Sequence, residues 1–235
     1  MIKILDYTTK VPLQMIGELT GVCWGSNITN SYKNACRAAD CIDAGHGRVE
    51  EFPDVYCIIE GYSARCLREL YTHIGGNPTR LQESTRYVNC GNFSYYIGDT
   101  IKTEEQLKVY KNCMINIASS YDKLIGLGVS KEDAANVLPL GMLSKMVWKV
   151  NLRTLVNFMN MRLCGRAYNE IRGLAIELRD NLSSYSPEWR EIANHLFIPK
   201  CLFYGKCTEK HPCKKTNYLN SYVIPNYWNI NEGDE

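Results

Sequence analysis

The stretch that decides the fold is MLSKMVWKV, residues 142–150, which runs directly into NLRTLVNFMNMR, residues 151–162. In the first part, apolar and polar residues alternate well enough to predict a β-strand. The second part has apolar residues at helical spacing, which predicts a helix over about 152–163. A strand that leads straight into a helix indicates a fold in which helices pack on a sheet.

The rest of the chain also mixes the two kinds of element. Strands are expected at residues 2–6 and 55–60, and a polar loop at 75–87 leads into an extended stretch at about 87–97. Because strands and helices do not alternate as regular βαβ units, the sequence predicts an α+β class, with helices packed on a central sheet. The predicted domain covers residues 1–200, and a cysteine-containing tail covers 201–235. Further helices are expected at residues 12–24, 31–44, 63–73, 104–127, 131–137, 165–180 and 187–196.

Composition and charge are those of a globular protein. The 235 residues fit one large domain, and 45% of them are apolar and 22% charged. The net charge of +2 comes from interspersed charges, so neither a nucleic acid polymer nor a membrane is an expected partner. The apolar part of the N-terminal stretch MIKILDYTTK is too short for a signal peptide, and no segment reaches the roughly 20 apolar residues of a membrane span. A cytoplasmic location is therefore expected.

The chain has 11 cysteines, which we expect to be mainly free thiols in a reducing compartment. The tail combines Cys201, Cys207, His211 and Cys213, all of which are possible zinc ligands. Their spacing is irregular and contains no Cys-x-x-Cys pair, so incidental thiols are favoured and no bound metal is expected. The sequence also lacks the motifs of Rossmann oxidoreductases, kinases and zinc proteases.

Residues 61–88 are unusually polar for a connecting segment. Arginine forks and hydroxyl groups that converge near a helix end could hold a phosphate. A solvated surface loop with a few ion pairs is the simpler explanation, and the residues alone leave both open. The polar side chains concerned are those of Arg65, Arg68, Glu69, His73, Arg80, Gln82, Glu83, Ser84 and Arg86.

The helix predicted over 152–163 carries an arginine on its apolar side. On a helical wheel, Arg153, Asn157 and Asn160 share one stripe, whereas Arg162 lies opposite them. Arg162 could pair with a buried carboxylate, extend to solvent or face a ligand with anionic or carbonyl oxygens. His46, between two glycines, could donate to a cofactor, although a loop histidine is more often simply exposed.

Two segments of the chain together resemble the flavin-dependent thymidylate synthase family. The first runs from Arg65 to His73 and then from Gln82 to Tyr87, and it is similar to a family signature in which an Arg-His-Arg triplet precedes Ser-x-Arg-Tyr. The second segment consists of Leu138-Pro139-Leu140, Trp148, Asn151-x-Arg153, Asn157-Phe-x-Asn160-x-Arg162, Ala167 and Glu170-Ile171, with Gly45-His46 upstream. The two segments occur in the same order as in the family, and the resemblance covers roughly residues 1–190.

The resemblance implies a role for each of these side chains. Arg162 and Ser84 are the expected catalytic residues: Arg162 would address the pyrimidine ring, and Ser84 would hold the nucleotide phosphate rather than attack as a nucleophile. The expected substrate-binding residues are Arg68, Glu69, Gln82, Glu83, Ser84, Arg86 and Arg162. The expected flavin-binding residues are His46, His73, Arg80, Asn151 and Asn157.

The same resemblance implies the chemistry and the assembly. In the family, NADPH reduces FAD, methylenetetrahydrofolate supplies a carbon to dUMP, and the reduced flavin supplies the hydride that completes the methyl group of dTMP. Family members are homotetramers with sites built from several subunits. Residues 61–88 of one chain would therefore meet residues 151–162 of another, and a monomer would be inactive.

Departures from the family pattern leave alternatives open. Thr72-His73-Ile74 replaces the Arg-His-Arg triplet and removes two positive charges, one of which Arg80 could replace. The loop is slightly longer than the family's, and Ala135 or Asn136 stands where an arginine is usual. The alternatives to thymidylate synthesis are a related C5 modification, such as hydroxymethylation, and a nucleotide-binding protein without catalysis.

Overall fold

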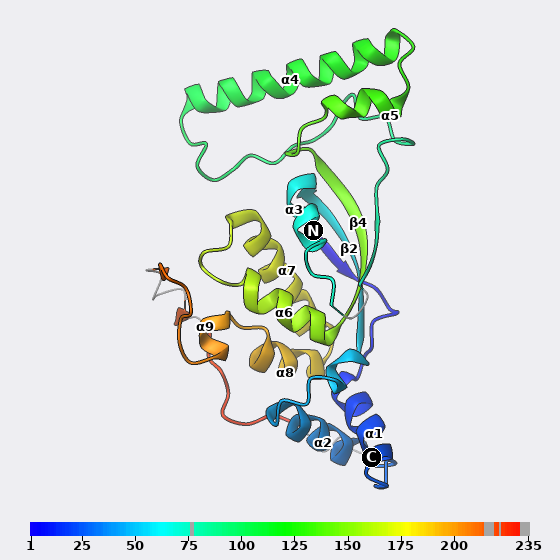
Figure 1. Cartoon of the computed structure of the whole chain (residues 1–235), viewed down its shortest axis with the longest axis vertical. Coiled ribbons are helices and arrows are strands. Elements are labelled where there is room, and N and C mark those ends of the chain that lie inside the picture. The colour runs from blue at the N-terminus through cyan, green and yellow to red at the C-terminus, as the bar shows by residue number, and fades with distance from the viewer. Residues whose placement is uncertain (76–77, 214–218, 221, 231–235) are drawn as a thin grey trace. The chain divides into compact units, whose positions relative to one another are not determined.

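The computed structural model describes residues 1–75, 78–213, 219–220 and 222–230 (Figure 1). The amide of Leu152 donates to the carbonyl of Pro53, and the amide of Ala64 donates to the carbonyl of Met142, so β2 and β4 are antiparallel. Together with the helices, this sheet confirms the predicted α+β class. The strand order is β1-β2-β4-β3, with β1 at Ile2–Ile4, β2 at Asp54–Ser63, β4 at Leu143–Asn151 and β3 at Thr79–Gln82.

The chain divides into two compact units. Strands β2 and β4 each run from one unit into the other, and the tail from residue 201 onwards belongs to the second unit. The first unit consists of Met1, Ile59–Thr72 and Arg80–Val147, and the second of Ile2–Ile58, His73–Thr79 and Trp148–Glu235.

The second unit is mainly helical, and its core is built around aromatic rings. Trp148 of β4 and Phe158 of α6 are completely buried and meet edge to face, with ring centres 5.5 Å apart. Burial of each such ring contributes about 1.5–3 kcal/mol, which fixes α6 against the strand that precedes it. The elements of this unit are α1 (Pro12–Cys23), α2 (Ser31–Asp43), the 3-10 turn η1 (Val49–Glu51), α6 (Leu152–Arg162), α7 (Asn169–Tyr185), α8 (Pro187–Leu196) and α9 (Lys200–Phe203).

The first unit contains the longest helix, α4, which begins at a capping box built on Thr103. Only Met114 and Tyr121 of this helix are buried, whereas Val109 and Ile115 are exposed. The helix therefore leaves part of its apolar surface uncovered within a single chain. The helical elements of this unit are α3 (Ala64–Leu70), α4 (Glu104–Gly126), α5 (Lys131–Ala134) and the 3-10 turn η2 (Ala135–Val137).

Most predicted elements are confirmed to within a few residues, but the prediction for 75–87 is wrong in part. This polar stretch contains strand β3, and the amide of Glu83, directly after β3, donates to the carbonyl of Lys145 in β4 at 2.8 Å. The alternation in Thr79–Gln82 is too short and too polar to indicate a strand, because β3 is a half-exposed edge strand. The stretch at 87–97, expected to be extended, forms one isolated bridge between Tyr95 and Met142.

Two helix boundaries also differ from the prediction. The helix expected at 63–73 ends at Leu70, where the amides of Tyr71 and Thr72 turn back to the carbonyls of Arg68 and Glu69. The helix expected to begin at 165 begins at Asn169, after a turn that opens at Cys164. His73 therefore lies beyond a helix end rather than on a helix face.

Candidate functional site

The central contact of the site joins two residues that are 89 positions apart in the sequence. The Nε atom of Arg162 donates to Nε2 of His73 at 3.1 Å. Arg162 ends α6 and is half-buried, and His73 is only 5% exposed. The arginine on the apolar side of the helix thus has an imidazole as a partner, which none of the three alternatives drawn from the wheel had named.

His73 is held as a neutral ring. Burial, followed by the positive charge of Arg162, lowers the pKa of His73 from 6.5 to about 4. Because Nε2 accepts from Arg162, the ring proton is assigned to Nδ1. This Nδ1 atom is buried and has no hydrogen-bond partner among the described residues, while the ring packs edge to face on Phe158. A buried donor without an acceptor costs about 1–3 kcal/mol, so it marks a position where a ligand oxygen or nitrogen would be bound favourably.

The start of α6 is fixed by a buried cap. The Oδ1 atom of Asn151 accepts a hydrogen bond from the amide of Thr154 at 3.0 Å. The hydroxyl of Thr154 in turn donates to the carbonyl of Gly75, which ties the segment after His73 to the first turn of α6. Asn151, predicted to bind the flavin, therefore has a structural role of its own.

A cavity of about 630 Å³ lies beside the polar stripe of α6. Arg153, Asn157 and Asn160 line it, as their common side of the helical wheel suggests. Gly45 and Gly47 line it from the loop after α2, and His46 between them is exposed. The remaining walls include residues of α8 and of the tail, among them Leu202, Phe203 and Tyr204.

The polar residues of this cavity differ in how they are engaged. Nδ2 of Asn160 donates to the carbonyls of Leu196 and Ile198 at 3.0 and 2.9 Å, so this buried amide ties α6 to the end of α8. Arg153 forms an ion pair with Glu51, and both side chains are largely exposed. Arg153 and Asn157 are thus the members of the stripe whose side chains remain open to solvent and to a ligand.

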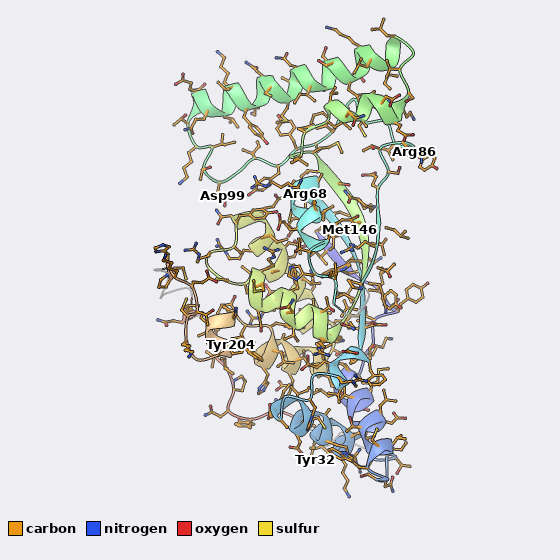
Figure 2. All side chains as sticks on the ribbon, in the orientation of Figure 1. Tyr32, Arg68, Arg86, Asp99, Met146 and Tyr204 are labelled. Carbon is orange, nitrogen blue, oxygen red and sulfur yellow. The ribbon has the colours of Figure 1, made fainter. Side chains whose placement is uncertain are left out.

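The residues predicted to hold the phosphate lie in the first unit. The Oγ atom of Ser84 accepts a hydrogen bond from the amide of Arg86 at 3.3 Å, so one turn positions both side chains. Nε of Arg86, which is labelled in Figure 2, pairs with Glu132 at 3.0 Å, and both side chains are more than 60% exposed. An exposed pair of this kind contributes about 0–1 kcal/mol, so the guanidinium can exchange Glu132 for a phosphate at little cost.

The side chains of Gln82 and Arg80 both form hydrogen bonds within the first unit. Nε2 of Gln82 donates to the hydroxyl of Ser144 at 3.3 Å. Nη1 of Arg80 donates to the carbonyl of Leu70 at 2.8 Å, and its guanidinium lies over the ring of Tyr71 at 4.0 Å. Arg80, predicted to compensate for the altered triplet, would have to leave these contacts to reach a flavin phosphate.

The remaining predicted residues are Arg68, Glu69 and Glu83. Arg68 is exposed in the last turn of α3, where Figure 2 labels it, Glu69 beside it is half-buried, and Glu83 is exposed. The predicted residues thus fall into two groups by unit. His46, His73, Asn151, Asn157 and Arg162 belong to the second unit, and Arg68, Glu69, Arg80, Gln82, Glu83, Ser84 and Arg86 belong to the first.

Comparison with known proteins identifies the family. The family model described as Thymidylate synthase complementing protein (Thy1) matches residues 3–188. The flavin-dependent thymidylate synthase of Geobacter sulfurreducens is 32% identical over 218 residues, which cover 88% of this chain and 90% of that protein. The chain belongs to the flavin-dependent thymidylate synthase family. The resemblance found in the sequence is thereby confirmed, and so is the prediction of an enzyme.

A further relative and two solved structures match most of the chain. The enzyme of Pyrococcus furiosus is 27% identical over 226 residues, 89% of each chain. The UMP/dUMP methylase PolB from Streptomyces cacaoi, solved with 5-Br dUMP, has a TM-score of 0.67 at 16% identity and covers 81% of this chain and 93% of its own. ThyX from Helicobacter pylori, solved with FAD and dUMP, has a TM-score of 0.60 at 19% identity and covers 80% of this chain and 97% of its own. At these identities the solved structures show a shared fold.

The side chains of the second unit fit a flavin of the kind that the family name implies. FAD carries an anionic pyrophosphate and a ring system rich in acceptor oxygens and nitrogens. Arg153 and Asn157 offer a cation and an amide beside the cavity, and His73 offers the buried Nδ1 donor that lacks a partner among the described residues. The cation and the amide beside the cavity therefore suit the anionic and acceptor groups of such a cofactor.

Proposed function

We propose that this chain is a thymidylate synthase that methylates dUMP to dTMP, with methylenetetrahydrofolate as the carbon donor and reduced FAD as the hydride source. The observation that carries the proposal is the contact between His73 and Arg162. It joins the two segments that resemble the family signature, although 89 positions separate them in the sequence.

Arg162 would bind the pyrimidine ring and stabilise negative charge on a ring carbonyl as the reaction proceeds. The hydrogen bond to His73 orients its guanidinium, and the neutral imidazole does not compete with the nucleotide for that positive charge. Ser84 and Arg86 would hold the nucleotide phosphate, supported by Gln82, Arg68, Glu69 and Glu83. The family's use of several subunits in one site provides the context in which the two groups would act together.

FAD, reduced by NADPH, would supply the hydride when bound. His73 would donate from Nδ1 to the flavin ring, Arg153 and Asn157 would bind its polar groups, and Asn151 would hold the start of α6 in place. His46 would approach from the glycine loop, and Gly45 supports that loop with a φ of 77°, a conformation that favours glycine.

We propose a homotetramer as the active form. The first unit supports this assembly because α4 exposes apolar side chains: Val109 is 67% exposed and Ile115 is 62% exposed. A groove of about 570 Å³ runs along the same helix, lined in part by Val109, Cys113 and Ile117. A second copy of this chain would cover these residues.

We propose the cytoplasm as the location. All 11 cysteines are free thiols, which suits a reducing compartment. Among the described residues, no helix combines the length and the apolar character needed to cross a membrane.

A related C5 modification of a pyrimidine nucleotide, such as hydroxymethylation, is the second candidate. The departure of Thr72 and Ile74 from the family's Arg-His-Arg triplet favours it, because the loss of two cations changes the surroundings of the flavin. The similarity to the fold of PolB is compatible with either reaction.

The test starts from the absorption spectrum of the purified protein, recorded before and after addition of FAD, dUMP and NADPH. We expect a bound flavin that bleaches with NADPH, and dTMP as the product once methylenetetrahydrofolate is added. A product that retains oxygen at the added carbon would select the second candidate. A chain that binds dUMP but no flavin under any of these conditions would refute both reactions and leave a nucleotide-binding protein.

A further inference from the structure

Four cysteines from two distant parts of the second unit gather around one small cavity. Cys164 follows the end of α6, whereas Cys201, Cys207 and Cys213 belong to the tail, and all four line a cavity of about 190 Å³. None of them forms a disulfide.

The surroundings of this cluster are positively charged. Arg166 and Lys200 line the same cavity, next to the thiols. Arg166 also donates to the carbonyl of His211 and pairs with Glu209 at 3.7 Å, which holds the tail beside the connection between α6 and α7. These cations would offset the negative charge of thiolates that bind a metal.

The part of the tail that carries Cys207 and Cys213 is irregular in structure. Residues 204–213 contain no helix or strand, and most of them are exposed. The contacts of this segment with Arg166 are exposed, and an exposed ion pair contributes only about 0–1 kcal/mol. A short segment without a core of its own typically needs a covalent or metal cross-link to stay in place.

We propose that Cys164, Cys201, Cys207 and Cys213 bind one Zn²⁺ as a structural site. Four thiolates around Zn²⁺ form the closed tetrahedral arrangement of structural zinc sites, which leaves no open position for catalysis. Each thiol releases its proton to solvent on binding, so no oxidant or reductant is required. The complex has a net charge of about −2, and the cations that line the cavity, Arg162, Arg166 and Lys200, outnumber its carboxylate, Glu209.

Closure of the site requires movement of the tail. In the part of the chain that the structure describes, no three His, Cys, Asp or Glu side chains already stand in a metal-binding arrangement. Zinc binding would draw the thiols of the exposed segment between Cys201 and Cys213 inward, towards Cys164 beyond the end of α6. Cys164 is also the ligand that tail spacing alone does not reveal, which is why the sequence favoured incidental thiols.

The site would brace the helix that carries the ring-binding arginine. Cys164 is two residues beyond Arg162, and Arg162 lines the same cavity as the four cysteines. Zinc would therefore fix the C-terminal end of α6 from one side, while Asn151 fixes its beginning.

The test is the metal content of the full-length protein, purified under reducing conditions without a metal-affinity step. We expect about one zinc per chain by inductively coupled plasma mass spectrometry, as for a closed structural site. Cys164→Ser and Cys207→Ser should each lose most of the metal, whereas the matched controls Cys23→Ser and His211→Ala should keep it. A protein without zinc, or zinc retained by both cysteine variants, would overturn the proposal.

A second measurement uses the wild-type protein and therefore tests the site even if the cysteine variants fail to fold. The wild-type protein, stripped with a chelator and titrated with Co²⁺, should show the thiolate-to-metal charge-transfer band and the visible bands of tetrahedral cobalt. A disulfide among Cys201, Cys207 and Cys213 in the metal-free protein as purified, with no cobalt bands after reduction, would contradict the site. Binding of FAD and dUMP is measured separately, so failure of the zinc site and failure of the proposed reaction are distinguishable.

Discussion

The hydrogen bond from Nε of Arg162 to Nε2 of His73, at 3.1 Å, makes each residue define the state of the other. The guanidinium adds to burial in keeping the imidazole neutral, and Nε2 of the neutral ring accepts a hydrogen bond that a protonated ring could not accept. The pair therefore presents a fixed cation and a fixed Nδ1 donor without exchanging a proton.

The first prediction concerns the pH dependence of stability. The pKa of His73 is about 4 in the folded chain and about 6.5 in the unfolded chain, so only the unfolded chain takes up the proton between these values. The free energy of unfolding should therefore fall as pH drops from about 6.5 to about 4, by at most about 3 kcal/mol from this residue. Denaturant unfolding at a series of pH values measures this change in the free energy of unfolding.

The variant His73→Gln isolates this contribution, because other groups also titrate in the window. Burial lowers the pKa of His195 as well, and it raises the pKa values of Glu50 and Glu188. These groups contribute equally to wild type and His73→Gln, so the difference between the two plots of unfolding free energy against pH reports His73 alone. An equal slope in wild type and His73→Gln would contradict the lowered pKa of His73.

The second prediction concerns the base-binding role of Arg162. Arg162→Ala should weaken dUMP binding by about 1.5–3 kcal/mol, the contribution of a hydrogen bond to a charged group. Isothermal titration with dUMP measures the affinity, and turnover should fall at least in proportion. Arg162→Lys should recover little, because lysine lacks the planar fork that contacts His73 and a ring carbonyl together. Unchanged affinity and turnover in the alanine variant would exclude the role.

The third prediction separates phosphate binding from a surface ion pair. Arg86→Ala should weaken dUMP binding by about 1.5–3 kcal/mol if its guanidinium holds the phosphate. Glu132→Ala removes the partner of Arg86 at an equally exposed position, and it should leave the affinity unchanged or improve it slightly. Deoxyuridine without the phosphate serves as the ligand control, since Arg86→Ala should not alter its binding. Similar dissociation constants for dUMP in wild type and Arg86→Ala would rule the phosphate contact out.

The sequence predicted much of the fold because its elements follow strong local patterns. The alternation in 142–150 and the helical spacing in 151–162 correspond to β4 and α6 with boundaries one residue away. Strand β3 escaped prediction because an edge strand of four residues, half-exposed, has no apolar periodicity to read. Its identity depends on the neighbouring strand β4, which is distant in sequence.

The site was predicted from resemblance more than from residue patterns. The wheel placed Arg162 on the apolar side, but no local signal pointed to His73 as its partner. Glu51, which pairs with Arg153 across 102 positions, lies in an ordinary acidic run and carries no motif. Likewise, Cys164 joins the tail cysteines only through the tertiary structure.

The fourth prediction separates the two roles of Asn151. If capping α6 is its main contribution, Asn151→Ala should lower the free energy of unfolding by about 1 kcal/mol, whereas Asn151→Asp should retain most of the cap, because a carboxylate also accepts from the amide of Thr154. If its amide also donates to FAD, the aspartate variant should bind FAD more weakly while unfolding at nearly the wild-type denaturant concentration. Chemical denaturation and flavin fluorescence titration measure the two effects in the same preparations. Full FAD affinity in Asn151→Asp would assign Asn151 to the helix cap alone, and the flavin contacts of α6 would then rest with Arg153 and Asn157.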